Sequence, residues 1–533
     1  MTDPQAYQRN TCLKIHPIQL TSLRTRNESQ ATRMTSTRTK RKRHIVRTNK
    51  PARKKVKTET DQFDDWEESV VHDPEQPQIG LLLKSAPYYE RCVPLPYDML
   101  MKIFHYIIET SDHPLKDLCN LAQVCEAWRL TILRTPSLWA RIDFSELPLT
   151  AGNVSVIKRI IKQNPKIRNQ INEFSIGGTI SCKNDKTISF LESLITAPNL
   201  SSLTIRRIAL SNRCNKPGAI IRSIQQCKNL KKLTITQSKM LFNNQKWLGD
   251  HLIENGQSLE ELNIAMSLTA VSNQLFKAVA SEFCPNLKVL DLSTCNALIT
   301  KSFDATLMAQ NMPNLEILRL GNVSFKPIHE PPQDYFLKKL VELSMPTARR
   351  DPDRDDALFA TLTYGSDQIT TLDLRGSAMS SSALIDMPSK NLKELHIDDI
   401  SPSMRHMYKT VLAKWAHSLE VLSFIKISCT DTVKDCLRTF SEFGDVVRLR
   451  EVDLQSSEIS PKELSAFIKS TPSLKSINLS SCRSLPRGCK GLYLRTVPKG
   501  SSSDNFKQLM SKITDEAETS SSLSRRRRAP CVI

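Results

Sequence analysis

A short apolar spacing that recurs along most of the chain is the feature that most limits how it can fold. The spacing is Leu-x-x-Leu-x-Leu, with Ile, Val, Phe or Met as substitutes, and it occurs twelve times at intervals of 23 to 30 residues. Such regularity indicates a repeat architecture, because one unit alone cannot close a hydrophobic core and neighbouring units must stack. The twelve units begin at Ile171, Leu200, Leu230, Leu259, Leu287, Leu315, Leu340, Ile369, Leu392, Leu419, Leu449 and Leu474.

Each unit combines a strand with, in several cases, a helix. Alternate residues of the apolar string point to one side of a strand, so we expect a short strand in every unit. Residues 275–280 and 464–468 have helical apolar spacing between strings. The strands are expected to form the inside of a curve and the bulkier helices its outside. Cys295 and Cys482 follow two of the strings at the same offset, which predicts structural rather than catalytic cysteines.

The residues between the inward positions would line the concave surface, and acidic side chains outnumber basic ones there. We therefore hypothesise that a basic protein segment docks on this surface. The alternative is that these acids are simply solvated. The candidate substrate-face residues are Asp373, Glu394, Asp398, Glu451 and Asp453.

The net charge of +20 lies mostly outside the repeats. Residues 1–57 carry +14 and residues 58–75 carry −8, while the Arg525–Arg528 run adds +4. This leaves +10 for residues 76–524, so the charge does not indicate a basic folded face. Nucleic acid is expected to bind only weakly, through the basic N-terminal segment.

Two basic clusters, nine residues apart, predict a nuclear localisation signal that would engage importin. The alternatives are a solvated tail with loose affinity for polyanions and, less favoured, a transit peptide. The expected localisation is nucleus, cytoplasm or both. The residues assigned to the signal are Lys40, Arg41, Lys42, Arg43, Arg53, Lys54, Lys55 and Lys57.

Residues 92–139 carry a second pattern, which is typical of a compact helical module. Pro114 begins a second helical stretch, and Trp128 with Ile132 marks a third. A module of this size cannot bury all its large apolar groups, so some are expected to remain exposed for a partner. The first helical stripe is formed by Leu100, Ile103, Phe104 and Ile107.

In order and spacing this module resembles an F-box, apart from Tyr97-Asp98 in place of a common acidic pair and a slightly long gap at 108–114. The resemblance implies binding to a small Skp-family adaptor and, through it, to a cullin-RING scaffold. The matching string is Leu95-Pro96-x-x-x-Leu100-x-x-Ile103-Phe104, Leu118-x-x-Leu121-x-x-Val124-Cys125-x-x-Trp128-Arg129, Pro136-x-Leu138-Trp139. It implies that the adaptor interface is formed or braced by Leu95, Pro96, Leu100, Ile103, Phe104, Leu118, Leu121, Val124 and Trp128.

An F-box followed by leucine-rich repeats resembles the F-box/LRR family over about 92–495. The implied fold is α/β: a leucine-rich-repeat solenoid, or horseshoe, preceded by a small all-α F-box. The implied function is substrate recognition in an SCF ubiquitin ligase, with degradation of the substrate by the proteasome. We expect a disordered tail at 1–90, the F-box at 91–145, the repeats at 146–496 and a second disordered tail at 497–533.

Catalytic chemistry has no sequence support. The chain has no Walker loop, no Gly-x-Gly-x-x-Gly, no His-Glu-x-x-His, no Gly-x-Ser-x-Gly and no Cys-x-x-Cys pair. We therefore predict no catalytic residue, cofactor or metal, and the lack of an apolar run of 18 residues predicts no membrane span. The alternative function is a leucine-rich-repeat scaffold or nuclear adaptor that never joins a ligase.

Overall fold

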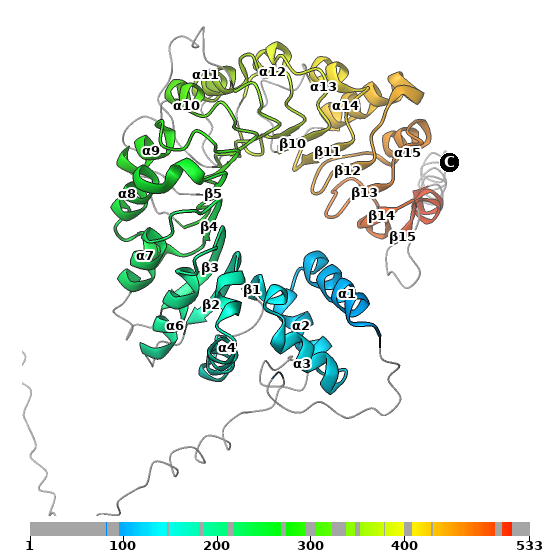
Figure 1. Ribbon diagram of the computed structural model, residues 1–533. Helices are drawn as coiled ribbons and strands as arrows, with labels where there is room; N and C mark the ends of the chain where they lie inside the picture. Colours follow the sequence, from blue (N-terminus) through cyan, green and yellow to red (C-terminus); the bar gives the residue numbers. More distant parts are fainter. Residues whose placement is uncertain are drawn as a thin grey trace, which may run out of the picture. The chain divides into compact units, whose positions relative to one another are not determined.

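The computed structural model (Figure 1) describes Leu82 and residues 95–145, 149–180, 185–210, 217–267, 273–294, 305–321, 337–346, 352–377, 379–398, 408–427, 430–495 and 504–513. The chain divides into two compact units, Met1–Pro74 and Glu75–Ile533, and all described residues lie in the second. The predicted nuclear localisation residues, 40–57, lie outside the described residues, as does most of the predicted tail at 1–90.

The described unit begins with three helices and a short 3-10 turn: α1 (Tyr97–Thr110), α2 (Pro114–Ala122), α3 (Glu126–Arg134) and η3 (Pro136–Trp139). Strand β1 (Arg141–Phe144) follows, and then α4 (Ala151–Gln163) and α5 (Lys166–Gln170). Pro114 occupies the first turn of α2, where its missing N–H removes no hydrogen bond. The Thr150 hydroxyl caps α4 by accepting a hydrogen bond from the Asn153 N–H at 3.1 Å.

A single sheet of fifteen strands follows chain order from β1 to β15, and strands β1 to β13 are parallel throughout. All twelve predicted strings contain a strand, β2 to β13. Their bounds are β2 Glu173–Ile180, β3 Ser202–Leu210, β4 Lys232–Thr236, β5 Glu261–Asn263, β6 Val289–Asp291, β7 Ile317–Arg319, β8 Glu342–Ser344, β9 Thr371–Asp373, β10 Glu394–Asp398, β11 Val421–Ile425, β12 Glu451–Asp453 and β13 Ser476–Asn478.

Helices cover one face of this sheet, as Figure 1 shows. The predicted helices at 275–280 and 464–468 lie within α9 and α15. The helices are α6 Asp185–Ile195, α7 Pro217–Gln225, α8 Lys246–Asn255, α9 Asn273–Ala280, α10 Ala305–Asn311, α11 Pro352–Thr363, α12 Ser381–Asp386, α13 Tyr408–Trp415, α14 Thr430–Phe443 and α15 Pro461–Ser470, with short 3-10 turns η4 Lys239–Phe242, η5 Gly256–Ser258, η7 Gly444–Val446 and η8 Arg487–Cys489. The opposite, helix-free face is formed by the alternate residues of β2 to β13 that point away from these helices.

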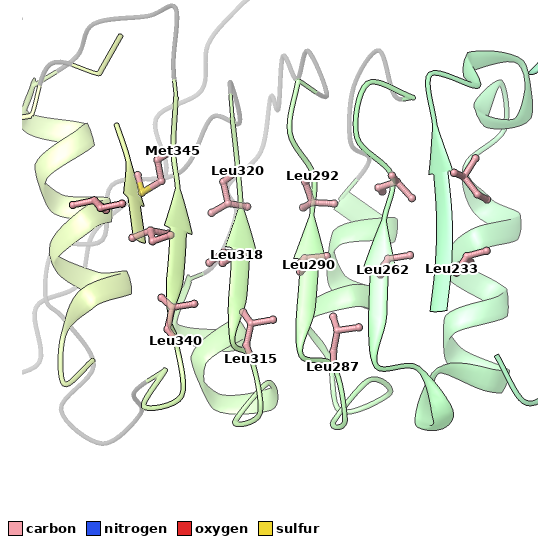
Figure 2. Close-up of a cluster of buried hydrophobic side chains, with 14 of the residues drawn as sticks. Leu233, Leu262, Leu287, Leu290, Leu292, Leu315, Leu318, Leu320, Leu340 and Met345 are labelled. Atoms are coloured by element: carbon pink, nitrogen blue, oxygen red, sulfur yellow. The ribbon is translucent and has the colours of Figure 1, made fainter. Parts of the chain in front are cut away.

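The core is built from the apolar strings stacked in register. The middle residue of each string lies opposite the middle residue of the next, as in Leu233↔Leu262 and Leu290↔Leu318. Figure 2 shows this row of leucines running from strand to strand. All three apolar positions of all twelve strings are buried. Alternation along each strand therefore assigns one set of side chains to the core and the other set to the helix-free face.

The backbone also repeats where the strands end. Two residues after the third apolar position, the described part of the chain has a positive φ in nine units: at Gly178, Arg207, Gln237, Met266, Thr294, Gly376, Lys426, Ser456 and Ser481. Most of these are not glycine, so the conformation costs free energy that the fold must offset. The N–H of Met266, for example, donates to the Ser293 carbonyl at 2.9 Å. At this position the backbone therefore gains a hydrogen bond to the next unit.

A buried row of small polar side chains follows these positions and ties each unit to its neighbour. The Ser267 hydroxyl donates to the Ile235 carbonyl at 2.6 Å and accepts from the Ser238 N–H at 3.1 Å. Cys482 occupies the same place and donates to the Leu454 carbonyl at 3.1 Å. Burial raises the pKa of the Cys482 thiol to about 11, which fits a structural role. Cys295 lies outside the described residues.

The C-terminal tail differs from the prediction. Strand β14 (Leu492–Leu494) pairs antiparallel with β13, and β15 (Asp504–Asn505) pairs with β14. A helix over residues 506–513 follows, so the expected disorder of 497–533 is wrong for 504–513. Phe506, Leu509 and Ile513 are buried in this helix, at a spacing that places them on one face. The end of the sheet is therefore covered by the chain itself.

The N-terminal limits of the regions also differ. Leu82, inside the expected tail, is fully buried, and its carbonyl accepts a hydrogen bond from Arg129 at 3.2 Å. The sheet begins before residue 146, because β1 pairs in parallel with β2 through Ile142↔Phe174. The buried residues form one cluster from Leu82 to Ile513, so the three helices and the sheet share a core.

The stacking predicts a large effect of truncation at a middle position. Leu318→Ala in β7 removes a fully buried side chain and is expected to lower the free energy of unfolding by about 2–5 kcal/mol. The adjacent Ile317→Ala on the helix-free face, where the side chain is half-buried, is the matched control and should cost less. Denaturant unfolding followed by circular dichroism measures both, and equal losses would contradict the assignment of faces.

Candidate functional site

Helix α1 has two apolar faces, one buried and one exposed. Its inner face buries Leu100, Phe104 and Ile108, which follow one another at a spacing of four residues. Pro96 caps the start of the helix, and its carbonyl accepts a hydrogen bond from the Leu100 N–H at 3.0 Å. Met101 also packs partly against this core, whereas Met99, Ile103 and Tyr106 of the same helix are exposed.

Aromatic contacts hold the inner face in place. Phe104 packs edge-on against Trp128 of α3, with ring centroids 5.1 Å apart. Trp139 of η3 is fully buried, and its indole N–H donates to the Ile132 carbonyl at 2.9 Å. Arg129 pairs with Glu126 on the same helix. These contacts make α1 to α3 a packed unit rather than three independent helices.

The outer face of α1 exposes large apolar side chains to solvent. Met99, Ile103 and Tyr106 lie at i, i+4 and i+7, so they form one strip along the helix. Three further exposed apolar residues belong to the same module. The exposed fractions are Leu95 41%, Tyr97 59%, Met99 54%, Ile103 37%, Tyr106 69% and Val124 39%. Single exposed apolar residues are ordinary, but a strip of three on one helix indicates a contact surface. The five of these residues that lie on α1 or just before it, Leu95, Tyr97, Met99, Ile103 and Tyr106, are the α1 surface.

The structure divides the predicted interface residues into three groups. Leu95, Pro96, Ile103 and Val124 are exposed. Leu121 and Trp128 are partly buried against the core. Leu100, Phe104 and Leu118 are buried by the chain itself, and the role of Leu100 and Phe104 in the interface stays a prediction. The helical spacing rule treats i+3 and i+4 as one face, and it therefore grouped Ile103 with Phe104 although the two point to different sides.

Sequence reasoning missed three residues of the α1 surface. Tyr97, Met99 and Tyr106 lie off the inner stripe, and nothing in the apolar spacing marked them. The signal in the sequence is residue type. The solvent-facing side of a helix is usually polar, so large apolar side chains outside the inner stripe are unusual.

In a comparison with known protein families, residues 94–145, which contain α1 to α3, match the family described as F-box-like. They are an F-box-like domain. A search of curated proteins finds no match to the chain. Among solved structures, a chain of "Crystal structure of Rad7 and Elc1 complex in yeast" is similar at 13% identity and a TM-score of 0.43, over 77% of this chain and 93% of that chain.

The F-box-like domain is joined firmly to the sheet that follows it. Arg141 in β1 donates to the carbonyls of Ile108, Glu109 and Ser111 at 2.9, 3.2 and 3.2 Å, at the C-terminal end of α1. The same guanidinium pairs with Glu173 of β2 at 3.0 Å. A cation at this end of a helix is favourable because the last carbonyls lack partners. One side chain therefore links α1 to the second strand.

The predicted substrate face has its charges partly neutralised. The Asp373 carboxylate is paired with Arg375 at 2.8 Å and also accepts a hydrogen bond from the Ser344 hydroxyl at 3.2 Å. Burial raises the pKa of Asp373, but the hydrogen bond and charge of Arg375 outweigh it, so the pKa is lowered overall. The Asp373 charge is therefore balanced within the chain.

The other four predicted residues of that face differ from Asp373 in exposure or in ion pairing. Glu394 and Asp453 are half-buried and Glu451 is exposed on the helix-free face. The side chain of Asp398 lies outside the described structure. Among the described residues, no cation forms a salt bridge with Glu394, Glu451 or Asp453. Asp373 is therefore paired with a cation, whereas Glu394, Glu451 and Asp453 are not paired with one among the described residues.

No alternative chemical site emerges from the parts of the chain that the structure describes. No group of three His, Cys, Asp or Glu side chains is placed to hold a metal ion there. Burial lowers the pKa of His251 to about 4 and raises that of Cys119 to about 12, and both side chains lie in the core. None of the described helices has the length and apolar character required to cross a membrane.

The two faces of α1 predict different consequences of truncation. Phe104→Ala should lower the free energy of unfolding by about 3–5 kcal/mol, because a buried ring stacked on Trp128 is lost. Tyr106→Ala, two residues along the helix but 69% exposed, should change it by no more than about 0.5 kcal/mol. Thermal unfolding of both variants tests this, and similar effects for the two would refute the division of α1 into inner and outer faces.

Proposed function

We propose that the chain is the substrate-recognition subunit of an SCF ubiquitin ligase. The F-box-like domain binds a Skp-family adaptor and, through it, a cullin-RING scaffold. The strand-and-helix units are leucine-rich repeats that hold a protein substrate for ubiquitination and proteasomal degradation. The observation that carries the proposal is the α1 surface: an F-box-like domain that leaves a strip of large apolar residues exposed.

The α1 surface fits a persistent partner. Full burial of a side chain such as Met99, Ile103 or Tyr106 contributes about 1.5–3 kcal/mol each, before the costs of association. Truncating a central anchor of an interface typically costs about 2–4 kcal/mol. A few such anchors are enough to hold an adaptor, and the packed inner face of α1 keeps them ordered before binding.

Recruitment requires no catalytic residue in this chain. A receptor accelerates transfer by holding the substrate near a separate enzyme, so what matters is the geometry between its two binding surfaces. The contacts of Arg141 with α1 and with Glu173 fix the F-box-like domain to β2. The T-shaped contact of Phe144 with Phe174, with centroids 6.4 Å apart, adds an apolar link at the same place. We propose a non-catalytic adaptor on these grounds.

The repeat assignment rests on the in-register strings and on the recurrent positive-φ position that follows them. Two stretches, residues 372–376 and 479–488, resemble F-box/LRR-repeat protein 6, and that narrower resemblance is part of the proposal. Localisation to the nucleus, the cytoplasm or both stays a prediction, as does the engagement of importin.

The proposal predicts that polar substitution of the α1 surface abolishes adaptor binding. The double variant Met99→Asp/Ile103→Asp places two carboxylates in an apolar interface without partners, and the affinity for a purified Skp-family adaptor should fall by more than about a hundredfold. Isothermal titration calorimetry with the full chain measures the affinity. Circular dichroism checks that the variant remains folded.

The matched control is Ile253→Asp, which introduces the same charge at an exposed apolar residue of α8, 46% exposed. This variant should bind the adaptor as the natural chain does. Retention of adaptor binding by the folded Met99→Asp/Ile103→Asp variant would refute the proposed role of the F-box-like domain.

A further inference from the structure

The positive charge of the region that follows the tails is concentrated in its first repeats. Residues 147–249 carry 17 Lys or Arg and 3 Asp or Glu, a net charge of +14. Between Glu192 and Asp250 there are ten Lys or Arg and no acidic residue. Because residues 76–524 carry +10 in total, the remainder of that region carries −4. The average charge therefore conceals a strongly basic stretch directly after the F-box-like domain.

Helices α4 and α5 carry part of this charge on their exposed side. Val154, Ile157 and Ile160 form the buried side of α4, and Ile167 is the buried residue of α5. Apart from Pro165, every exposed residue from 155 to 170 is Lys, Arg, Ser, Asn or Gln. These exposed residues are Ser155, Lys158, Arg159, Lys162, Gln163, Lys166, Asn169 and Gln170.

The end of α3 adds a fifth cation, and both neighbours hold the two helices in place. Asn164, which follows α4, donates from its side-chain amide to the Leu133 carbonyl of α3 at 3.3 Å. Arg134, the next residue of α3, is exposed. On the other side, the Arg168 guanidinium of α5 donates to the Ser193 carbonyl of α6 at 3.0 Å. Arg134 and the eight exposed residues of α4 and α5 are the α4–α5 surface.

The five cations of the α4–α5 surface have no acidic partner within the described part of the chain. Further along the array, by contrast, Lys232 pairs with Glu261 at 3.4 Å. Lys158 and Lys162 also lie one turn apart on α4, and like charges at that spacing destabilise a helix. An anionic partner would remove this repulsion.

A second observation is that this part of the molecule lacks the apolar anchors of a protein interface. Among the described residues between Val124 and Ile253, no large apolar side chain is exposed. Protein interfaces depend on a few buried aromatic or aliphatic anchors and contain little Lys. Interfaces with nucleic acid are polar and strongly positive, and their phosphate contacts come from Lys, Arg, Ser, Asn and Gln. The α4–α5 surface consists of these five residue types.

The burial of the aromatic side chains in this region favours a double-stranded partner. Single strands are bound largely by stacking of their bases on exposed aromatic rings. The backbone of a duplex requires only cations and hydrogen-bond donors. From η3 to α8, the buried aromatic residues are Trp139, Phe144, Phe174, Phe190, Phe242 and Trp247.

We propose that the α4–α5 surface binds the phosphate backbone of double-stranded nucleic acid without preference for sequence. The five cations contact phosphates, and the amides of Gln163, Asn169 and Gln170 donate hydrogen bonds to phosphate oxygens. Helix α4 has 13 residues and is about 20 Å long, so it extends along roughly six base pairs. This binding goes beyond the proposed function and does not depend on it.

The probe is a fluorescein-labelled DNA duplex of about 20 base pairs, titrated against the full chain by fluorescence anisotropy at several salt concentrations. Lys158→Gln/Lys162→Gln should weaken binding and reduce the slope of log affinity against log salt by about 2, because each lost phosphate contact releases about one counterion fewer. Duplexes of unrelated sequence should show the same loss. An RNA duplex is titrated in parallel, and a loss of slope with either duplex supports the inference and identifies the nucleic acid.

The matched control is Lys462→Gln/Lys469→Gln, which removes the same charge from two exposed lysines of α15. It should leave the affinity and the salt slope unchanged. Equal losses in the two double variants would mean that only net charge acts. An unchanged slope in Lys158→Gln/Lys162→Gln, with circular dichroism showing a folded chain, would mean that the duplex binds elsewhere, for example at the basic N-terminal segment. Either result overturns the inference.

Competition separates nucleic acid from other anionic partners. The competitors are vesicles that contain phosphatidylserine and a polyglutamate peptide, each added to the labelled duplex bound by the full chain. Both should displace the duplex only at a much higher concentration of negative charge than an unlabelled duplex requires. Displacement at an equal or lower concentration of charge would assign the α4–α5 surface to a membrane or to an acidic protein, and the inference would be wrong.

Discussion

The packing of each apolar string on the same string of the next unit is the contact on which the whole described fold depends. The middle row runs in register from Ile142 through Phe174 and onward to Ile477. Each residue of the row is buried by its neighbours on both sides. No unit could be stable alone, because half of the surface of every string would be exposed, and the stability of such an array is a sum of contacts between nearest neighbours.

An array of this kind requires a cover at each end, and the two covers here are different. The far end is closed by the antiparallel strand β14, by β15 and by the helix at 506–513. The near end is closed by the F-box-like domain, whose last residues form β1. The domain that presents the α1 surface is therefore also the first structural unit of the sheet. Because its core is continuous with that of the repeats, it cannot turn freely relative to β2, and the Arg141 contacts add to this restraint.

The repeats were predictable from the sequence because their signal is redundant. Each string alone is weak evidence, but twelve strings at one spacing determine the strands, the register and the buried face together. The C-terminal helix has a helical apolar spacing from Phe506 to Ile513, yet this spacing occurs once and amid polar residues, so the sequence predicts a tail there. Leu82 could not be recognised at all, since a single buried residue has no period.

The functional surfaces were less predictable because they depend on neighbours that the sequence does not show. Ile103 and Phe104 are adjacent and both apolar, and only the placement of α2 and α3 decides that one is exposed and the other buried. The same holds for the acids: Asp373 is balanced because Arg375 folds back on it, whereas Glu394 has no such partner among the described residues. The apolar pattern of a sequence predicts which residues form the core. It does not predict which apolar residues stay exposed or which acids lack a cation nearby.

The contrast between the two surfaces has a physical meaning in the proposed ligase. The α1 surface is apolar, and binding through apolar burial is insensitive to salt, which suits a partner that stays bound. The carboxylates of Glu394, Glu451 and Asp453 lie on the helix-free face, where electrostatic attraction would speed the encounter with a charged partner more than it adds affinity. In the proposed receptor a substrate must bind, be modified and dissociate, so charged contacts that allow rapid association and dissociation suit it better than apolar burial.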